Sequence, residues 1–439
     1  MELEARPAPA PVPFRGSAPF LAKAPPLWLP MRHFVLSAAA WWVFAAGFAW
    51  GADRFLGFDF QARWVLGLTH VLTLGWVAAT IFGALCQLTP VLWETSLASE
   101  TAAKAAWWLL AAGLLSFVGL IWGGGDQYWR GAALLAGAVA LYLFVFGRTM
   151  RSARKLDWTG VHLLFAFAYL AALVAVGAAL AWDRQRGILF RSGDGALIAH
   201  VHLALVGWVS LTIVGVSYRL VSMFALAHVE TKVLGRLTLT LVNVGLVGLA
   251  LDSLYFGRRL TPLWASLLAL AYLAYAAQMR KIFSARLKRI DPALAFTLLA
   301  LAGGALWCAL GLGLAFGWLE DTTESRLAYV FAALVGWVTP FIIGQMHKIV
   351  PFLVWLHAYS PRHWTPPVRV PTIQDLTSER TAWLELAALA LGAGLGVAAF
   401  LSGSQPLLRA SGAFLLACAT LYAGNIGYTL SHLRKKGAK

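Results

Sequence analysis

Long apolar stretches alternate with short polar segments along this chain of 439 residues. Most stretches reach or exceed about 20 residues, the length that lets an α-helix cross the hydrocarbon core of a bilayer. The predicted spans cover residues 33–56, 64–92, 104–123, 130–148, 160–182, 196–226, 232–256, 263–283, 293–317, 326–357, 381–401 and 406–432. The pattern therefore predicts an all-α integral membrane protein with twelve transmembrane helices.

The composition supports the same fold class. Hydrophobic residues make up 60% of the chain and charged residues only 12%, and there are 21 tryptophans. A net charge of +16 would indicate nucleic acid in a soluble protein, but here the basic residues gather in alternate loops, as the positive-inside rule describes. These residues are Arg148, Arg151, Arg154, Lys155, Arg280, Lys281, Arg286, Lys288, Arg289, Arg434, Lys435, Lys436 and Lys439. We expect a multi-pass protein of the cell (inner) membrane, with both termini in the cytoplasm, the lipid bilayer as partner and no nucleic acid.

The chain divides into a tail and one membrane domain. Residues 1–30 are rich in proline and alanine and lack the apolar core of a secretory signal. They are predicted to form a disordered cytoplasmic tail, and residues 31–439 the membrane domain. Cys86, Cys308 and Cys418 stand alone in or near apolar spans, which indicates packing rather than a disulfide or a zinc site.

Three sequence blocks align without gaps and indicate an internal repeat. They are HVLTLGWVAATIFGALCQLTP at 70–90, HLALVGWVSLTIVGVSYRLVS at 202–222 and FAALVGWVTPFIIGQMHKIVP at 331–351. Each contains Gly-Trp-Val followed by a second glycine, and small residues at fixed places let helices approach closely. The spacing predicts three pseudo-symmetric units of four helices, at roughly 31–155, 156–290 and 291–439, rather than two halves of six.

Two histidines, His200 and His202, lie one residue apart in the sixth span. A histidine at membrane depth is costly unless it has a function. Residues two apart on an α-helix differ by about 200°, so these two are expected to face opposite flanks. His70 holds in the first block the place that His202 holds in the second. We expect His70 and His202 to face one another across a gap and ligate a haem iron, since a six-coordinate iron takes two such ligands.

The predicted topology also gives the surroundings of this site. If the N-terminus is inside, the second, sixth and tenth spans run inward, so the three histidines lie toward the outer face. Haem propionates would then meet the outer loops, where Arg258 and Arg259 are candidate partners. Further candidates are Arg184, Arg186 and Arg191.

The sixth span resembles a known motif. His-Val-His, four residues, Gly-Trp-Val, five residues, Gly and then Tyr at position 218 is similar to the tenth helix of the catalytic subunit of cbb-type cytochrome c oxidases. These enzymes belong to the haem-copper oxidase superfamily, which also has twelve helices in three groups of four. The resemblance implies that His202 and His70 ligate a low-spin haem and that His200 ligates a second, open-faced haem, so that the chain holds one or two haem b groups.

The sequence departs from that superfamily at the copper site. There the histidine pair lies in the third unit, beside further histidines on the sixth and seventh helices. Here the pair lies in the second unit, Tyr329 and Phe331 occupy the third, and no adjacent His-His pair occurs. Copper is thus left open, and the chain also resembles the NnrS-like group, haem proteins associated with nitric oxide stress. We expect binding of NO, CO or O2, electron transfer, or both, as a haem-dependent oxidoreductase if the protein is an enzyme.

A second distinctive stretch is GQMHKIVPFLVWLHAYSPRHW at 344–364. His347 is expected about 27 Å further along its span than the level of His200, near the inner surface. It forms, with Lys348, Tyr218 and Arg219, a candidate quinone or lipid-headgroup pocket. The alternative is an interfacial anchor of lysine and aromatic residues.

Two other classes of function remain open from the sequence. One is a cofactor-free transporter or an assembly factor for metal or haem, although the chain has no cluster of the soft ligands that copper handling uses. The other is a structural subunit of a respiratory complex, which would make other subunits its partners.

Overall fold

The structure is a computed structural model that describes residues 25–56, 62–153, 156–184, 186–190, 193–359 and 370–434. Most of the predicted tail lies outside these residues. So do five of the basic loop and tail residues named above and one candidate propionate partner: Arg154, Lys155, Lys435, Lys436, Lys439 and Arg191.

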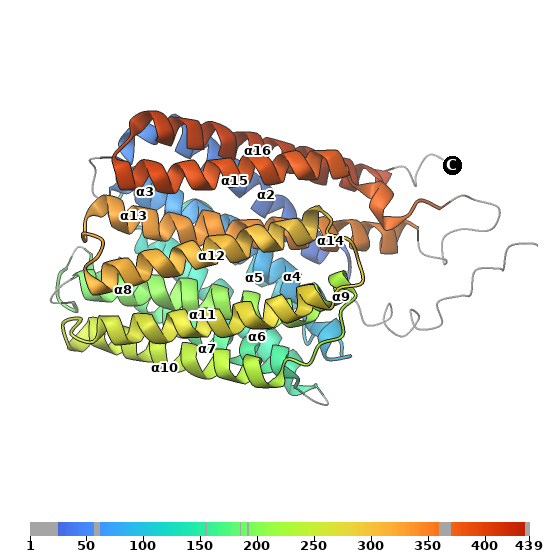
Figure 1. The fold of residues 1–439 in the computed structure, drawn as a ribbon, viewed down its shortest axis with the longest axis horizontal. Helices are drawn as coiled ribbons and strands as arrows, with labels where there is room; N and C mark the ends of the chain where they lie inside the picture. The colour runs from blue at the N-terminus through green and yellow to red at the C-terminus, as the bar shows by residue number, and fades with distance from the viewer. Residues whose placement is uncertain are drawn as a thin grey trace, which may run out of the picture.

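The described chain folds into a bundle of long helices that run roughly side by side (Figure 1). Twelve of them are long and apolar enough to cross a membrane, which confirms the predicted number of spans in an all-helical multi-pass protein. Nine are single α-helices: α2 (Trp28–Trp50), α5 (Glu100–Trp122), α6 (Trp129–Arg151), α7 (Trp158–Asp183), α10 (Lys232–Tyr255), α11 (Thr261–Ser284), α12 (Pro292–Phe316), α15 (Glu379–Ser402) and α16 (Gln405–Ser431). Short 3-10 helices add η1 (Ala52–Arg54) and η6 (Ile373–Leu376).

The other three spans are interrupted by π-helical segments. They are α3 (Arg63–His70), η2 (Val71–Ala78) and α4 (Ala79–Leu92); α8 (Gly193–His202), η3 (Leu203–Ser210) and α9 (Leu211–Ala225); and α13 (Thr323–Phe331), η4 (Ala332–Val338) and α14 (Thr339–Ala358). Each π segment contains the Gly-Trp-Val of one sequence block. A π segment inserts an extra residue into a helical turn and is common at functional sites.

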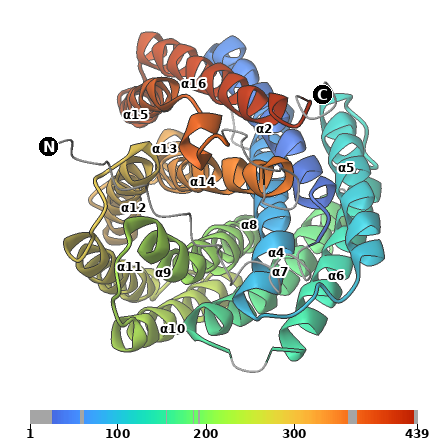
Figure 2. The ribbon, with the colours of Figure 1, turned by 90° about the vertical axis from the view of Figure 1, so that its right-hand side faces the viewer.

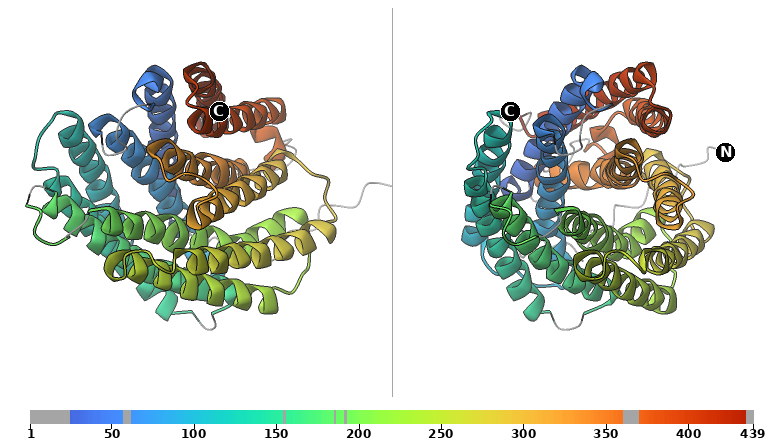
Figure 3. Two further views of the ribbon diagram at one scale, coloured as in Figure 1. Left: turned by 60° about the vertical axis from the view of Figure 1, so that its left-hand side comes forward. Right: turned by 90° about the vertical axis from the view of Figure 1, so that its left-hand side faces the viewer.

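These three interrupted helices form the centre of the bundle. More of their most apolar residues are buried than in any of the other nine spans, and Figure 2 shows the remaining helices around them. Outer helices pack as neighbouring pairs, α5 with α6, α10 with α11 and α15 with α16. Helices α7, α12 and α2 join these pairs into a ring, seen from further sides in Figure 3. Contacts link α6 with α7 and α7 with α10, α11 with α12 and α12 with α15, and α16 with α2 and α2 with α5.

Tryptophans of the π segments join the central helices to one another. Trp76 Nε1 donates to Thr339 Oγ1 at 3.1 Å, and Trp337 Nε1 donates to Ser210 Oγ at 3.0 Å. Trp208, at the same place in its block, lies instead against the ring of Phe82, with centroids 5.6 Å apart. Each tryptophan thus reaches from its own inner helix to a neighbouring one.

Polar caps fix where several helices begin. The side chains of Asp157, Asp291 and Ser378 accept hydrogen bonds from the first turns of α7, α12 and α15. Such a cap satisfies a backbone donor that has no partner within the helix, which is worth about 1 kcal/mol. These caps therefore fix the positions of the adjoining loops at the ends of the bundle.

A candidate cofactor cavity

A cavity of about 730 Å³ surrounds α8. Its lining is largely apolar, and its volume falls within the usual range of about 300–1,000 Å³ for ligand pockets. The lining residues come from both sides of α8, which packs between α7 and α10. We call the part lined by α3, α5, α6 and α7 the first arm, and the part lined by α10, α11, α12 and α13 the second arm.

His70 presents one ring nitrogen to the first arm. Its Nδ1 donates to the carbonyl of Leu66 at 2.8 Å, and its ring lies edge-on to Phe117. Because a carbonyl can only accept, this bond places the proton on Nδ1 and leaves the lone pair on Nε2. Thr69 and Thr73 line the same wall, but their hydroxyls donate to backbone carbonyls one turn earlier. His70 is thus held in the tautomer that metal-ligating histidines adopt.

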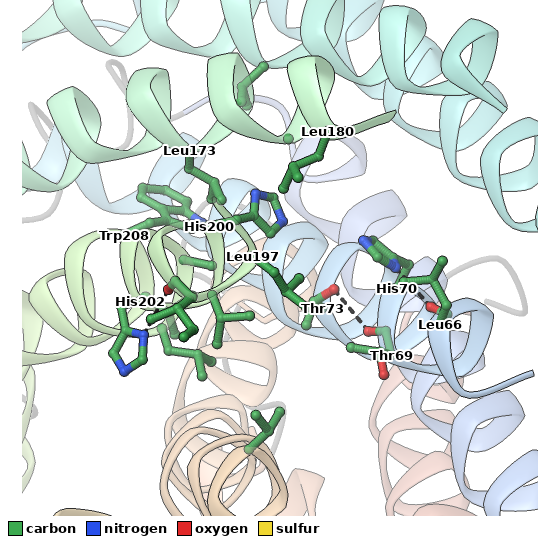
Figure 4. Close-up of a pocket in the computed structure, with 18 of the residues that line it drawn as sticks. Leu66, Thr69, His70, Thr73, Leu173, Leu180, Leu197, His200, His202 and Trp208 are labelled. Atoms are coloured by element: carbon green, nitrogen blue, oxygen red, sulfur yellow. Dashed lines mark hydrogen bonds between the residues drawn. The ribbon is translucent and has the colours of Figure 1, made fainter. Parts of the chain in front are cut away.

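His200 extends from α8 into the same arm. Gly177 of α7 makes room for it, since a Cβ at that glycine would lie 2.7 Å from Cε1 of the His200 ring. The Nδ1 atom of His200 is buried without a hydrogen-bond partner, although the carbonyl of Leu173 faces the ring. His70 and His200 are close enough for their charges to interact, and Figure 4 shows the two rings turned toward a common space.

His202 points the other way, into the second arm. Its Nδ1 donates to the carbonyl of Ile198 at 2.8 Å, and its Nε2 accepts from the hydroxyl of Tyr329 at 3.0 Å. Figure 4 shows the rings of His200 and His202 leaving α8 in different directions, which confirms that they face opposite flanks.

The structure therefore brings His70 together with His200, whereas the sequence analysis paired His70 with His202. The reason is geometric. His200 and His202 leave α8 on opposite flanks, and the flank with His200 borders the first arm together with His70. His202 instead reaches Tyr329 of α13.

Arginines and aspartates surround one end of the cavity. Arg326 forms two hydrogen bonds with Asp321, at 2.6 and 2.9 Å, and Arg258 lies 3.5 Å from the same carboxylate. The bonds from Arg326 are the main reason why the pKa of Asp321 is below its usual value. Arg258 has φ of +65°, a backbone conformation that is strained for a side chain of this size. Arg259 is exposed and does not line the cavity.

A smaller cavity of about 150 Å³ adjoins the first arm at this end. It shares Leu66, Tyr128 and Arg184 with the large cavity and adds Arg63 and Asp126. Arg186 is exposed and lies over the Trp182 ring. Two arginines and a phenol therefore line this end of the first arm, about two helical turns before His70 in the case of Arg63, where an anionic group could leave the apolar space.

The donors in the cavity are compatible with a haem. In the described ranges, no three or more His, Cys, Asp and Glu side chains are grouped so as to hold a metal ion. A haem needs only one or two protein ligands, because the porphyrin supplies the other four. The first arm offers His70 Nε2 and the His200 ring, apolar walls and arginines at its end, which is the set of groups that a haem requires.

The four residues of the expected quinone pocket have separate partners. His347 bonds to Glu385, and Lys348 pairs with Asp291. Tyr218 lies edge-on to His162, while Arg219 is exposed. None of the four residues lines either cavity.

The sequence analysis missed some of these contacts. It named Tyr329 only as a departure from a family pattern, and it did not single out Glu385. A glutamate inside the apolar run 381–401 was the available signal, because a carboxylate at that depth is expensive. Nothing in the sequence marked Gly177 as the residue that makes room for His200.

Neither a scan of protein-family models nor a search of curated protein sequences finds a match to this chain.

Proposed function

We propose that this chain is a haem-binding membrane protein of haem-copper-oxidase-like architecture, with haem b held in the first arm between His70 and His200. The observation that carries the proposal is the placement of these two histidines, from the second and the sixth span, at one apolar cavity. A bound haem would supply reversible one-electron chemistry at its iron. The function proposed is electron transfer, binding of a diatomic gas such as NO, CO or O2, or both.

The role of His70 rests on its fixed orientation. The bond from Nδ1 to Leu66 sets the ring angle before any ligand binds, and it increases the basicity of Nε2. His200 has no such bond at Nδ1, so its ring could rotate to ligate the iron. The ring nitrogen that does not ligate the iron would then carry the proton. His70 would thus hold a haem iron from a fixed position, and His200 would adapt its ring to it.

The orientation of the haem follows from the polarity of the first arm. Its long walls are apolar and suit the porphyrin faces, whereas Arg63, Tyr128 and Arg184 gather where it adjoins the smaller cavity. Propionates directed to that end would gain charge-assisted hydrogen bonds. Arg258 lines the corresponding end of the second arm, where it could bond a propionate of a haem held there.

The second arm is the candidate site for a gas or for a second haem. It presents one histidine, His202, whose Nε2 is engaged by Tyr329. A haem with one protein ligand keeps a coordination position for a diatomic gas. If His202 is a ligand, as the resemblance implies, its bond to Tyr329 must open. Copper has no part in this proposal.

The three-unit architecture belongs to the same proposal. Its support is that a π segment occurs at the Gly-Trp-Val of every block, and that Trp76 and Trp337 make matching bonds to neighbouring inner helices. The third gap of this arrangement lies between the tenth and the second span. By position in the blocks, Phe331 and Leu68 there correspond to His70 and His200. The rings of Phe48 and Phe400 pack against Phe331. Aromatic packing would then fill the gap that holds no histidine.

The membrane, the topology and the electron partners are part of this proposal. We propose the inner membrane, both termini in the cytoplasm, and a quinone or other respiratory-complex subunits as electron partners. Their basis is the basic loops and the polar residues His347 and Lys348 at the opposite end of the tenth span.

Optical spectra test the haem assignment. The purified protein is recorded oxidised and dithionite-reduced, with and without carbon monoxide, together with His70→Ala, His200→Ala and His202→Ala. We expect low-spin bands that are lost in His70→Ala and in His200→Ala but kept in His202→Ala. A carbon monoxide shift that disappears only in His202→Ala would add the gas site of the second arm.

His33→Ala is the matched control. His33 is also buried and also bonds a carbonyl through Nδ1, but it lies outside both cavities. Its replacement should leave the bands unchanged. Haem bands lost in His70→Ala and His202→Ala but kept in His200→Ala would support the pairing expected from the sequence instead. A folded wild-type protein that neither contains haem nor takes it up would end the proposal.

A further inference from the structure

A second buried polar cluster lies far along the tenth span from the cavity, where α14, α15 and α16 meet. His347 Nε2 is 2.8 Å from Glu385 Oε2, and the side chains are 5% and 0% exposed. Asn425 Nδ2 donates to the other carboxylate oxygen at 3.1 Å. Asn425 is itself held by the backbone of Ser378, through both its oxygen and its nitrogen. The carboxylate is therefore fixed in place on both of its oxygens.

The bonds of this cluster determine where a proton can bind. Glu385 accepts from Asn425, and its second oxygen accepts from the Nε2–H of His347. In the neutral imidazole the basic nitrogen is then Nδ1, and the pair carries one negative charge. A proton that binds at Nδ1 gives an imidazolium beside a carboxylate and brings the net charge to zero. An uncompensated carboxylate is costly in an apolar interior, and a neutral pair avoids that cost.

His347 differs in this respect from four other histidines of the bundle. His33, His70, His162 and His202 all donate from Nδ1 to the carbonyl four residues earlier. Among the hydrogen bonds formed in the described part of the chain, none involves Nδ1 of His347. His347 is instead oriented through its other nitrogen by a carboxylate.

Polar side chains lead from this pair along one face of α16 toward the end of the bundle. Asn425, Thr429 and His432 follow one another at helical spacing along one face of α16, and the Thr429 hydroxyl bonds to the carbonyls of Asn425 and Leu376. His432 accepts from or donates to Tyr359 at the end of the bundle. The other titratable or charged groups on the elements packed here are Lys348 and His357 of α14, Asp291 before α12 and Cys308 of α12, Glu379 and Arg380 of α15, Asp375 of η6, and Arg409, Cys418, Tyr422 and Tyr428 of α16.

The charged groups around the pair of His347 and Glu385 are bonded elsewhere or exposed. Asp291 pairs with both Lys348 and Lys288, and Asp375 bonds to Thr372. Glu379 lies six residues before Glu385 on α15, about 9 Å nearer to the end of the helix, and is exposed.

We infer that His347 and Glu385 form a membrane-embedded proton-binding site, which takes up one proton at His347 Nδ1 and exchanges it with solvent at the end of the bundle that carries η6. This site is independent of the haem proposal. Its ligand is the proton, and it gives the chain a function in proton handling at the opposite end from the cavity.

Infrared difference spectra against pH test the site in the full-length protein in lipid nanodiscs. Histidine is labelled with nitrogen-15, and pH is varied from about 4 to about 9, which brackets ordinary carboxyl and imidazole values. His347→Gln keeps an amide nitrogen that donates to Glu385 but has no titrating nitrogen. Glu385→Gln keeps the shape of the acceptor without its charge, and Glu379→Gln on the same helix is the matched control.

We expect the wild-type protein to show a titration step in which labelled ring bands and carboxylate bands change at the same pH. That step should be lost completely in His347→Gln and in Glu385→Gln and kept in Glu379→Gln. A step that persists in the two folded variants would overturn the inference. The wild-type spectrum decides even if a variant does not fold, since ring and carboxylate bands that titrate at different pH values, or not at all, also overturn it.

Discussion

Gly177 determines how much room the His200 ring has on the wall of the first arm. A Cβ added there would lie 2.7 Å from Cε1 and 3.2 Å from Nδ1 of that ring. Contacts this short force the imidazole away from its position, and a shift of this kind costs about 1–3 kcal/mol. Gly177→Ala should therefore weaken haem retention by about tenfold or more, although it changes no ligand.

Gly147→Ala is the control for this prediction. Gly147 lies in α6, and a Cβ added there would meet nothing within 4 Å. The control should retain haem fully, and it should be slightly more stable because alanine favours a helix over glycine by about 1 kcal/mol. Haem retention is measured by transfer to an apo-globin acceptor. Equal transfer rates in the two variants would mean that the His200 ring does not contact the haem.

At the scale of elements, one carboxylate joins the loop before α13 to its surroundings. Asp321 accepts two hydrogen bonds from Arg326 in the first turn of α13 and also faces Arg258 from the loop after α10. These cations lower the pKa of Asp321, mainly through the bonds from Arg326. A lowered folded-state pKa means that the stabilisation is fully present above the unfolded value of about 3.9 and is lost as pH falls through the folded value.

Asp321→Asn should remove that acid dependence. We expect a small loss of stability at neutral pH, within about 1 kcal/mol because the pair is partly exposed and screened. The variant should also change less than the wild-type protein as pH falls below about 4. Amide hydrogen exchange in α13, followed against pH, is the measurement. Glu320→Gln at the exposed neighbouring position is the control, and identical pH profiles for Asp321→Asn and wild-type protein would contradict the prediction.

Elements were more predictable from the sequence than the contacts between them. Apolar run length alone located all twelve spans, because the bilayer sets the length of a helix independently of its neighbours. The π segments were not predictable, since an extra residue in a helical turn is retained only where packing accepts it. Gly-Trp-Val marked their places without revealing their geometry.

The candidate site was predictable only in part for the same reason. Periodicity around one helix correctly separated His200 from His202. Which of them meets His70 depends on how two helices are rotated against one another, and no single-helix pattern contains that information. Glu385 was missed because its partner, His347, lies on another helix and the two are 38 residues apart in sequence.

At the scale of the whole molecule, the tryptophan bonds hold the three central helices together. Trp76 is fully buried, and its Nε1 depends on Thr339 Oγ1 for a partner. Thr339→Val removes that hydroxyl while keeping the branched shape of the side chain, so a buried donor loses its acceptor. The expected cost is about 1 kcal/mol, and it belongs to the contact between the second and the tenth spans rather than to either helix alone.

Thr339→Ser separates the hydroxyl from the shape of the side chain. Serine keeps the acceptor for Trp76 and the donor to the carbonyl of Leu334, so it should recover most of the lost stability. Ser210→Ala should act like Thr339→Val, because it removes the acceptor of Trp337. Ala78 occupies the third equivalent position without a hydroxyl, and Trp208 lines the cavity, so Ala78→Ser should change little. Reversible unfolding in mixed micelles gives the four free energies. If valine and serine at position 339 are equally stable, these bonds do not hold the centre together, and packing of the π segments alone must do so.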